Sequence, residues 1–222
     1  MYKLMNVGDD MVITCEVGPF PTNAYFYIDD SSKHGFLIDP GYEAPELLKV
    51  IKNRELTVEK ILLTHGHFDH IGAVNELQSA LNIPVCMQSN GCNYVKNSEM
   101  NGSKIFHGPP IIINGEVTYL EDYSEIGLIN NPDFKLKIFP VPGHTTDGAM
   151  YYSANDGVAF VGDSIFYGSI GRTDLPGGNY SELIENIKRK ILTLPDDTIL
   201  LSGHSEPTTV GEEKTRYWFN IN

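Results

Sequence analysis

Residues 64–70 of this chain read Thr64-His65-Gly66-His67-Phe68-Asp69-His70, which gathers three imidazoles and one carboxylate within six positions. A short apolar run typical of a buried strand, residues 60–63, precedes this stretch. An apolar periodicity typical of a helix follows it over residues 71–81. The pattern therefore predicts a turn between a buried strand and a helix, where polar side chains converge above a sheet edge.

The four polar side chains of this turn are suited to bind metal. His65 and His67 extend from the strand end, whereas Asp69 and His70 begin the helix and face back toward them. Four Lewis-basic groups that converge in this way indicate a metal site, and two pairs indicate two metals. The alternative is a polar loop that happens to be rich in histidine.

Three more candidate ligands, His144, Asp163 and His204, each end an apolar run and directly follow a glycine. A glycine at that point allows a tight turn of the backbone while packing of the strand holds the ligand. Five of the seven histidines are then candidate ligands. The other two, His34 and His107, lie in polar or Gly/Pro-flanked stretches and are predicted to be exposed loop residues.

The order of these residues resembles the five metal-binding motifs of the metallo-β-lactamase superfamily, over nearly the whole chain. Residues 37–41, Leu-Ile-Asp-Pro-Gly, resemble its early strand-end aspartate, and residues 20–25 resemble its entry strand. The resemblance implies a four-layer αββα sandwich with the metals at one sheet edge, whereas the sequence pattern alone predicts only a mixed α/β fold.

The resemblance also implies two divalent metal ions, zinc first, with iron or manganese as alternatives. It assigns the first metal to His65, His67 and His144, the second to Asp69, His70 and His204, and the bridging position to Asp163. A hydroxide between the metals would be the nucleophile, because the pKa of metal-bound water falls to about 7. Asp69 would be catalytic as well, because it would orient that hydroxide and relay its proton.

Residues 171–178, Gly-Arg-Thr-Asp-Leu-Pro-Gly-Gly, are similar to the short glyoxalase II-like hydrolases and to persulfide dioxygenases. The first expectation is therefore a hydrolase of a small thioester or ester. The alternative is a mononuclear iron persulfide dioxygenase that uses His65, His144 and Asp163 as a two-histidine, one-carboxylate set. A third hypothesis is a metal-binding scaffold without activity. Hydrolysis of a lactone or β-lactam belongs to the same range of chemistries.

Two residues outside the ligand set have two interpretations each. Arg172 is expected to bind a substrate carboxylate through its planar guanidinium, or else to form a structural pair with Asp174. Asp39 is expected to accept a hydrogen bond from a ligand histidine and fix its ring orientation, or else to form a strand-end turn with Pro40 and Gly41.

One feature departs from full-length glyoxalase II enzymes, which carry an additional C-terminal helical region that helps to bind glutathione. In this sequence only residues 206–222 follow the last candidate ligand, which is too short for that region. The identity of the acyl and thiol parts of the substrate therefore stays open.

Composition agrees with an enzyme that acts on a small molecule. A length of 222 residues suits a single domain over 1–222. The net charge of −13 would repel polyanions, so no nucleic-acid partner is expected. The sequence specifies no oligomeric state.

No apolar run approaches membrane-spanning length, and the first ten residues lack the apolar core of a signal peptide. The three cysteines, Cys15, Cys86 and Cys92, have no zinc-finger spacing and are expected to be free or buried thiols. These features predict a cytoplasmic protein without a membrane partner.

Periodicity predicts the main elements as follows. Strands are expected at 11–17, 24–29, 36–38, 61–63, 84–87, 136–141, 149–153 and 158–161, and helices at 44–52, 180–194 and 210–219, with a helix inside 68–81. Residues 88–115 are expected to form a short helix and a loop near the mouth of the site.

Overall fold

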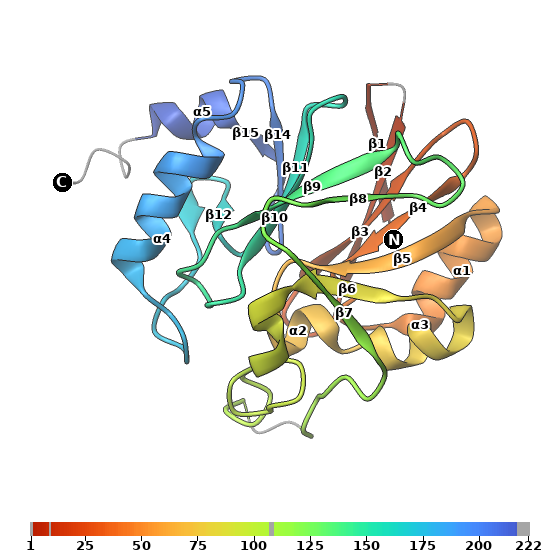
Figure 1. Ribbon diagram of the computed structural model, residues 1–222, viewed down its shortest axis with the longest axis horizontal. Helices are drawn as coiled ribbons and strands as arrows, with labels where there is room; N and C mark the ends of the chain where they lie inside the picture. The colour runs from red at the N-terminus through yellow and green to blue at the C-terminus, as the bar shows by residue number, and fades with distance from the viewer. Residues whose placement is uncertain (1, 9, 107–108, 217–222) are drawn as a thin grey trace.

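The computed structural model describes residues 2–8, 10–106 and 109–216. Figure 1 shows two sheets packed face to face, with α1 (Ala44–Arg54) and α3 (Val74–Leu81) on one outer side. On the other outer side lie α4 (Tyr180–Asn186) and α5 (Val210–Thr215). The expected four-layer αββα sandwich is therefore confirmed.

The first sheet has seven strands in the order β1 to β7. Its strands are β1 (Tyr2–Val7), β2 (Asp10–Val17), β3 (Thr22–Ile28), β4 (His34–Ile38), β5 (Thr57–Leu63), β6 (Val85–Gln88) and β7 (Val117–Leu120). Strands β1 to β4 pair antiparallel, whereas β4 to β7 pair parallel. The parallel half brings the carboxyl ends of β4 and β5 to one edge.

The second sheet has six strands in the order β15-β14-β11-β10-β9-β8. Its strands are β8 (Glu125–Gly127), β9 (Lys135–Pro140), β10 (Ala149–Ser153), β11 (Val158–Gly162), β14 (Ile199–Ser202) and β15 (Thr208–Thr209). A small hairpin, β12 (Ile165–Phe166) with β13 (Ser169–Ile170), follows β11. Because β11 and β14 pair in parallel, their carboxyl ends also meet at one edge.

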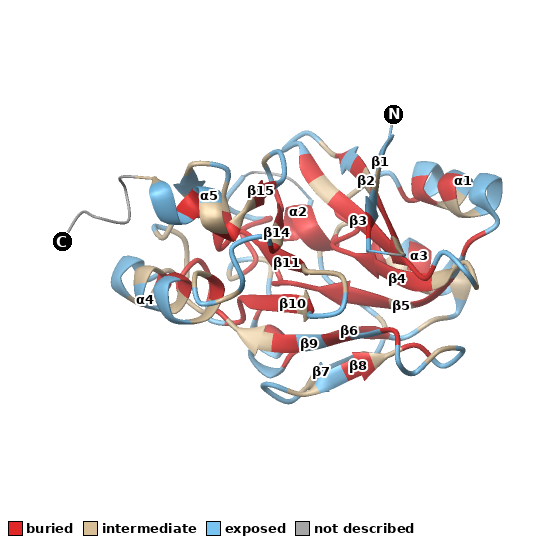
Figure 2. Cartoon of the chain, turned by 90° about the horizontal axis from the view of Figure 1, so that it is seen from above, coloured by how far each residue is buried: buried red, intermediate tan, exposed pale blue. Residues whose placement is uncertain are grey.

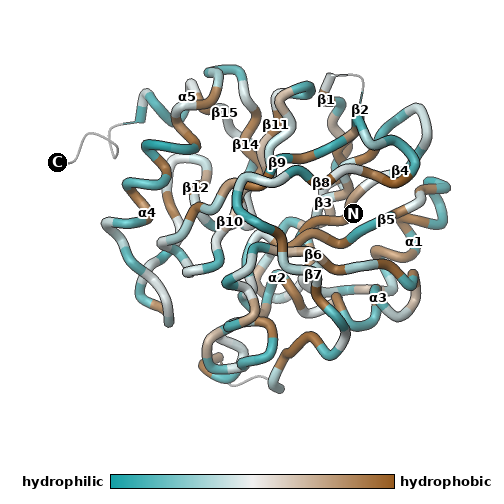
Figure 3. The backbone as a smooth tube through the Cα atoms, in the orientation of Figure 1, coloured by the Kyte–Doolittle hydropathy of each residue, from teal (hydrophilic) through white to brown (hydrophobic). Residues whose placement is uncertain are grey.

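Three apolar layers hold the sandwich together. The layer between the sheets includes Tyr27, Phe36, Leu62 and Phe160, all almost fully buried. Figure 2 shows buried residues along β3, β5, β9 and β10, and Figure 3 shows that apolar stretches concentrate in the strands at the middle of the molecule. The outer layers lie between the first sheet and α1 and α3, and between the second sheet and α4. Burial of these side chains is the main stabilising contribution.

Several predicted boundaries are corrected. The helix predicted over 180–194 is α4 followed by a wider π-helical turn, η2 (Ile187–Ile191). The last helix ends at Thr215, where the backbone of Arg216 becomes extended, and the rest of the predicted range from 217 lies outside the described residues. Residues 68–81 hold two helices, α2 (Phe68–Ile71) and α3, and the irregular stretch after β6 begins with a 3₁₀-helix, η1 (Ser89–Asn93).

The prediction for His34 is wrong, whereas His107 lies outside the described residues. His34 begins β4 instead of lying in an exposed loop, and its Nδ1 lies 2.7 Å from the buried carboxylate of Glu59. The three cysteines are free thiols, as predicted, and within the described ranges no helix is long and apolar enough to span a membrane.

Candidate metal centre

The seven candidate ligands lie at the edge where strands of both sheets end. His65 and His67 follow β5, and Asp69 and His70 lie in the single turn of α2. The other three, His144, Asp163 and His204, lie just beyond β9, β11 and β14. A backbone hydrogen bond of 2.8 Å from Ala149 to Thr64 joins the end of β5 to the second sheet. Both sheets therefore contribute ligands.

The structure brings all seven side chains together in three overlapping groups, within each of which the possible ligand atoms lie within 4.8 Å of one another. The groups are His65, His67 and His144; Asp69, His70 and His204; and His65, His70 and Asp163. The first two groups match the two sets that the resemblance implies.

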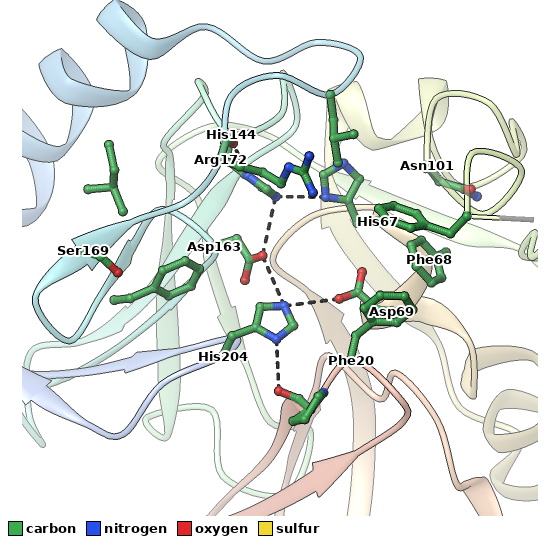
Figure 4. A pocket seen from close by; sticks show the side chains of 15 residues that line it. Phe20, His67, Phe68, Asp69, Asn101, His144, Asp163, Ser169, Arg172 and His204 are labelled. Carbon is green, nitrogen blue, oxygen red and sulfur yellow. Dashed lines mark hydrogen bonds and ion pairs between the residues drawn. The ribbon is translucent and has the colours of Figure 1, made fainter.

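Asp163 lies between those two sets (Figure 4). Its Oδ1 is 3.4 Å from Nε2 of His70, and its Oδ2 is 3.6 Å from Nε2 of His144 and 3.3 Å from Nε2 of His204. One carboxylate thus faces histidines of both sets, which is the geometry that a bridging ligand requires.

The unsatisfied atoms of the centre fit metal ions. Nε2 of His70 and Oδ1 of Asp163 are buried and have no hydrogen-bond partner among the described residues. A buried polar atom without a partner costs about 1–3 kcal/mol. In addition, Nδ1 of His67 lies 3.1 Å from Nε2 of His65 and 2.9 Å from Nε2 of His144. A cation among these converging atoms satisfies them together.

Electrostatics divides the centre into two halves. In the first, burial and the neighbouring histidines lower the pKa of His65 well below its ordinary value and that of His67 to about 3. Burial also lowers the pKa of His144. All three rings are therefore neutral at pH 7, which is the form that binds metal.

In the second half, carboxylates oppose the effect of burial. Burial alone would lower the pKa of both His70 and His204. The carboxylates beside them, Asp163 foremost, instead raise the pKa of His70 well above its ordinary value and that of His204 to about 10. The same histidines hold the pKa of Asp163 well below the ordinary value of 3.8 against the effect of burial. This half attracts positive charge, and a metal that binds there displaces protons.

Hydrogen bonds to the far side of three rings orient those histidines. Nδ1 of His70 donates to Oδ2 of Asp39 at 3.0 Å. Nδ1 of His144 donates to the backbone carbonyl of Arg172 at 2.7 Å, and Nδ1 of His204 donates to that of Pro21 at 3.0 Å. Each bond leaves Nε2 to face the centre. The two carbonyl partners are new relative to the sequence prediction.

Asp39 combines both of its predicted features. Besides the bond from His70, its carboxylate accepts from the backbone N–H of Thr64 at 2.8 Å and from the Thr64 hydroxyl at 2.6 Å. Its φ of 49° lies in the left-handed region, which Asp tolerates in a turn. The residue is therefore a turn former and also contacts a candidate ligand.

Arg172 lines the cavity above the centre and also pairs with Asp174. Its Nε and Nη2 each donate to one carboxylate oxygen of Asp174 at 2.7 Å. The bond from Arg172 lowers the pKa of Asp174 to about 2, so the pair is ionised and close to neutral overall at pH 7. The structural interpretation of this arginine thus holds, and its position in the cavity leaves a role in substrate binding open.

The cavity has a volume of about 500 Å³ and opens above the candidate ligands. His67, Asp69, His144, Asp163 and His204 form its floor. Aromatic and aliphatic residues form most of the remaining wall, namely Phe20, Pro21, Phe68, Phe106, Phe166, Ile170 and Leu175. A largely apolar cleft with convergent polar groups is the usual form of a small-molecule site.

Comparison with known proteins gives a family match over most of the chain. The model of the metallo-beta-lactamase superfamily matches residues 17–204. The chain is 39% identical over 198 residues to the probable metallo-hydrolase YqgX of Bacillus subtilis, covering 89% of this chain and 92% of YqgX. It is 36% identical over 188 residues to the hydroxyacylglutathione hydrolase GloC of Haemophilus influenzae, covering 83% of this chain and 86% of GloC.

Two solved structures are similar to the whole sandwich. The BLEG-1 B3 metallo-beta-lactamase superimposes with a TM-score of 0.89 at 36% identity, covering 94% of this chain and 99% of that one. TTHA1623 in a di-iron-bound form superimposes with a TM-score of 0.82 at 32% identity, covering 91% and 97%. These similarities extend across both sheets.

Proposed function

The chain belongs to the metallo-beta-lactamase superfamily, and from this premise we propose that it is a dinuclear metal-dependent hydrolase of a small thioester or ester. The position of Asp163 between two complete ligand groups is the observation that carries the proposal. The names of YqgX, a probable metallo-hydrolase, and of GloC, a hydroxyacylglutathione hydrolase, support hydrolysis and a thioester respectively.

His65, His67 and His144 would hold one metal, Asp69, His70 and His204 the other, and Asp163 would bridge them. Two divalent ions, which we propose to be zinc, would supply a hydroxide at neutral pH and a Lewis acid for the carbonyl. Iron stays an alternative because TTHA1623 is known in a di-iron-bound form, and manganese stays a further one.

Asp69 is the proposed catalytic carboxylate. Its Oδ2 lies 3.2 Å from Nε2 of His204 and 3.3 Å from the hydroxyl of Thr22, which orient it at the cavity floor. A carboxylate held there can orient a water molecule and accept its proton. Burial opposes its ionisation, but His70 and His204 keep the pKa of Asp69 below 3.8, so it is a base at neutral pH.

Arg172 is proposed to bind substrate as a hydrogen-bond donor. Its Nε and Nη2 each donate one hydrogen bond to Asp174, which leaves both N–H groups of Nη1 and the second N–H of Nη2 as donors for a substrate oxygen. We propose a small-molecule substrate rather than a nucleic acid or membrane partner, and the net charge of −13 supports this. A cytoplasmic location stays a prediction.

The second candidate function is the mononuclear iron persulfide dioxygenase with His65, His144 and Asp163. The combination of two histidines and a carboxylate suits non-haem iron, and the iron-bound relative supports iron as a metal for this fold. Against it, the second ligand group is complete, and an oxygenase of this kind has no use for it.

Metal analysis and an anaerobic assay distinguish the two functions. We expect protein purified without added metal to hold two equivalents of zinc and to cleave S-lactoylglutathione or a simpler thioester without oxygen. One equivalent of iron, together with oxygen consumption that requires glutathione persulfide, would instead establish the dioxygenase and overturn the hydrolase.

A further inference from the structure

We propose that Phe20, Phe68 and Phe106, here called the aromatic triad, bind an uncharged apolar acyl group of the substrate. The proposal rests on the proposed hydrolase function, because it names the substrate class of the same site. It follows from the position of the triad, from the crevice behind it and from the charges of the cavity.

The triad is a compact cluster beside the metal centre. The ring centroids of Phe20 and Phe68 lie 5.3 Å apart, those of Phe20 and Phe106 5.3 Å, and those of Phe68 and Phe106 5.4 Å. The rings come from the β2–β3 loop, the start of α2 and the loop after η1. Figure 4 shows Phe20 and Phe68 beside Asp69 at one end of the cavity.

The triad is tied directly to the candidate ligands. Phe68 stands between His67 and Asp69 in the sequence, and Phe20 precedes Pro21, whose carbonyl accepts the bond from His204. A group that lies on these rings therefore lies in the same cavity as the candidate ligands. Positioning by a remote apolar contact is a common means of orienting a substrate.

The apolar surface of the triad is incompletely covered by protein. Phe20 and Phe106 are each 39% exposed, although they face a cavity and contact one another. The same three rings line a second crevice of about 310 Å³, together with Pro19, Tyr42, Pro109, Ile111 and one small polar residue, Ser103. The apolar surface thus continues past the main cavity, which gives room for an acyl group larger than acetyl. Covering such a surface with an apolar group is favourable.

The described lining of the cavity offers no free Lys or Arg side chain to an acidic acyl group. Among the described residues that line it, Arg172 is the one Lys or Arg, and Asp174 already neutralises it. Asp69 and Asp163 on the floor are candidate ligands, so the metals would compensate their charges. Apart from the metals, a carboxylate in this cavity meets no uncompensated cation among those lining residues.

The test compares thioesters of one neutral thiol, N-acetylcysteamine, that differ only in the acyl group. We expect kcat/KM for the 3-phenylpropionyl thioester to exceed that of the acetyl and succinyl thioesters by about tenfold or more, as is typical for apolar pockets.

Phe106→Ala should reduce the ratio of phenylpropionyl to acetyl activity by a similar factor. The matched control is Tyr119→Ala, because Tyr119 is an equally exposed aromatic residue on β7, outside the lining of the cavity, and the ratio should not change.

A second variant tests the argument from charge. Asp174→Ala removes the partner of Arg172, so kcat/KM for the succinyl thioester should rise severalfold while that for the acetyl thioester changes little. Metal content and the melting temperature of each variant are measured in parallel, which separates a change of specificity from a loss of structure.

The outcomes separate this inference from the proposed function. Equal activity on acetyl, succinyl and phenylpropionyl thioesters overturns the triad as an acyl site and leaves the hydrolase intact. If the protein cleaves neither these thioesters nor the corresponding esters, the hydrolase proposal fails. Calorimetric titration of the metal-loaded protein with 4-phenylbutan-2-one still tests the triad in that case. Binding that Phe106→Ala abolishes and Tyr119→Ala preserves supports the site, and equal binding by all three proteins overturns it.

Discussion

Asp39 is the residue through which the first sheet sets the orientation of His70. Its two oxygens accept three hydrogen bonds, two from Thr64 and one from His70, and the side chain is almost fully buried. Because an amide offers only one oxygen, Asn at this position cannot accept all three bonds. Asn does tolerate the left-handed backbone, so the turn itself is retained.

We therefore expect Asp39→Asn to keep the fold and to weaken metal binding by about 10- to 100-fold, the usual cost of losing a partner of a ligand histidine. Competition with a chelator measures the affinity, and circular dichroism checks the fold. Unchanged affinity would reduce Asp39 to a turn former.

At the scale of single residues, the seven candidate ligands could be predicted because each lies in a short motif at a strand end. The carbonyls of Pro21 and Arg172 could not, because every residue carries a carbonyl and only the fold selects which one meets a histidine. The aromatic triad was missed for a related reason, since its three rings come from distant segments and carry no common pattern.

At the scale of elements, the turn after β14 brings backbone against the centre. A methyl group at Gly203 would overlap Oδ1 of Asp163 and lie 2.6 Å from Cε1 of His70. The backbone there is also fixed, because Gly203 N–H donates to Gly162 at 3.0 Å and its carbonyl accepts from Asn23 at 2.7 Å. The backbone at the end of β14 therefore cannot move away from Asp163 and His70 to make room for a methyl group.

Gly203→Ala should consequently displace Asp163 and His70 and cause most of the bound metal to be lost, while the secondary structure persists. Elemental analysis measures the metal. Gly115→Ala is the matched control, because an added methyl there meets only the end of the flexible Gln78 side chain. Full metal content in both variants would contradict the close packing at this turn.

Central elements could be predicted from the sequence better than edge elements. Strand β11 is a continuous apolar run and β5 ends in one, and periodicity detects both runs. Among the strands that were not predicted, β1, β7 and β8 lie at sheet edges, mostly expose their side chains and form through pairing with a neighbour. The two-residue strands β12, β13 and β15 are too short for periodicity to detect. Their formation depends on tertiary contacts that local propensity does not encode.

At the scale of the whole molecule, the candidate metal centre joins the two sheets. Four candidate ligands follow the first sheet, and His144, Asp163 and His204 follow the second. We propose on this ground that both sheets belong to one domain. Metal that binds only the folded chain stabilises it by about 2.7 kcal/mol when its concentration is 100 times its Kd.

Removal of metal by a chelator should therefore lower the melting temperature by roughly 5–10 °C for a chain of this size. Differential scanning calorimetry with and without chelator measures the shift. In Asp163→Ala the shift should be much smaller, because the bridging ligand is absent. An equal shift in both proteins would show that the chelator acts elsewhere.

A second whole-molecule prediction concerns pH, and it involves a group far from the metal centre. Burial, with Asp156 and Asp29 nearby, raises the pKa of Asp10 from 3.8 to about 6, although the N–H of Asp30 donates to it. The folded protein therefore holds this proton more tightly than the unfolded chain. Stability from this group is highest below about pH 4 and is lost as the pH rises to about 6.

Asp10→Asn removes this charge, so it should raise the free energy of unfolding at pH 7 by about 1 kcal/mol, after allowance for solvent screening at a partly exposed site. The difference from the unmodified chain should disappear near pH 4. Thermal unfolding of both proteins across this pH range measures it. A stabilisation that is the same at every pH would exclude ionisation of Asp10 as its cause.

The pairing of Arg172 with Asp174 has a consequence for divergence. Asp174 is exposed and is not one of the candidate ligands, so its replacement would alter the charge offered to a substrate of the proposed hydrolase without removing a ligand. Under the proposed function, substrate preference and chemistry would be encoded at separate positions of one gene. After duplication, one copy can drift toward acidic substrates by a single substitution while purifying selection preserves its histidines.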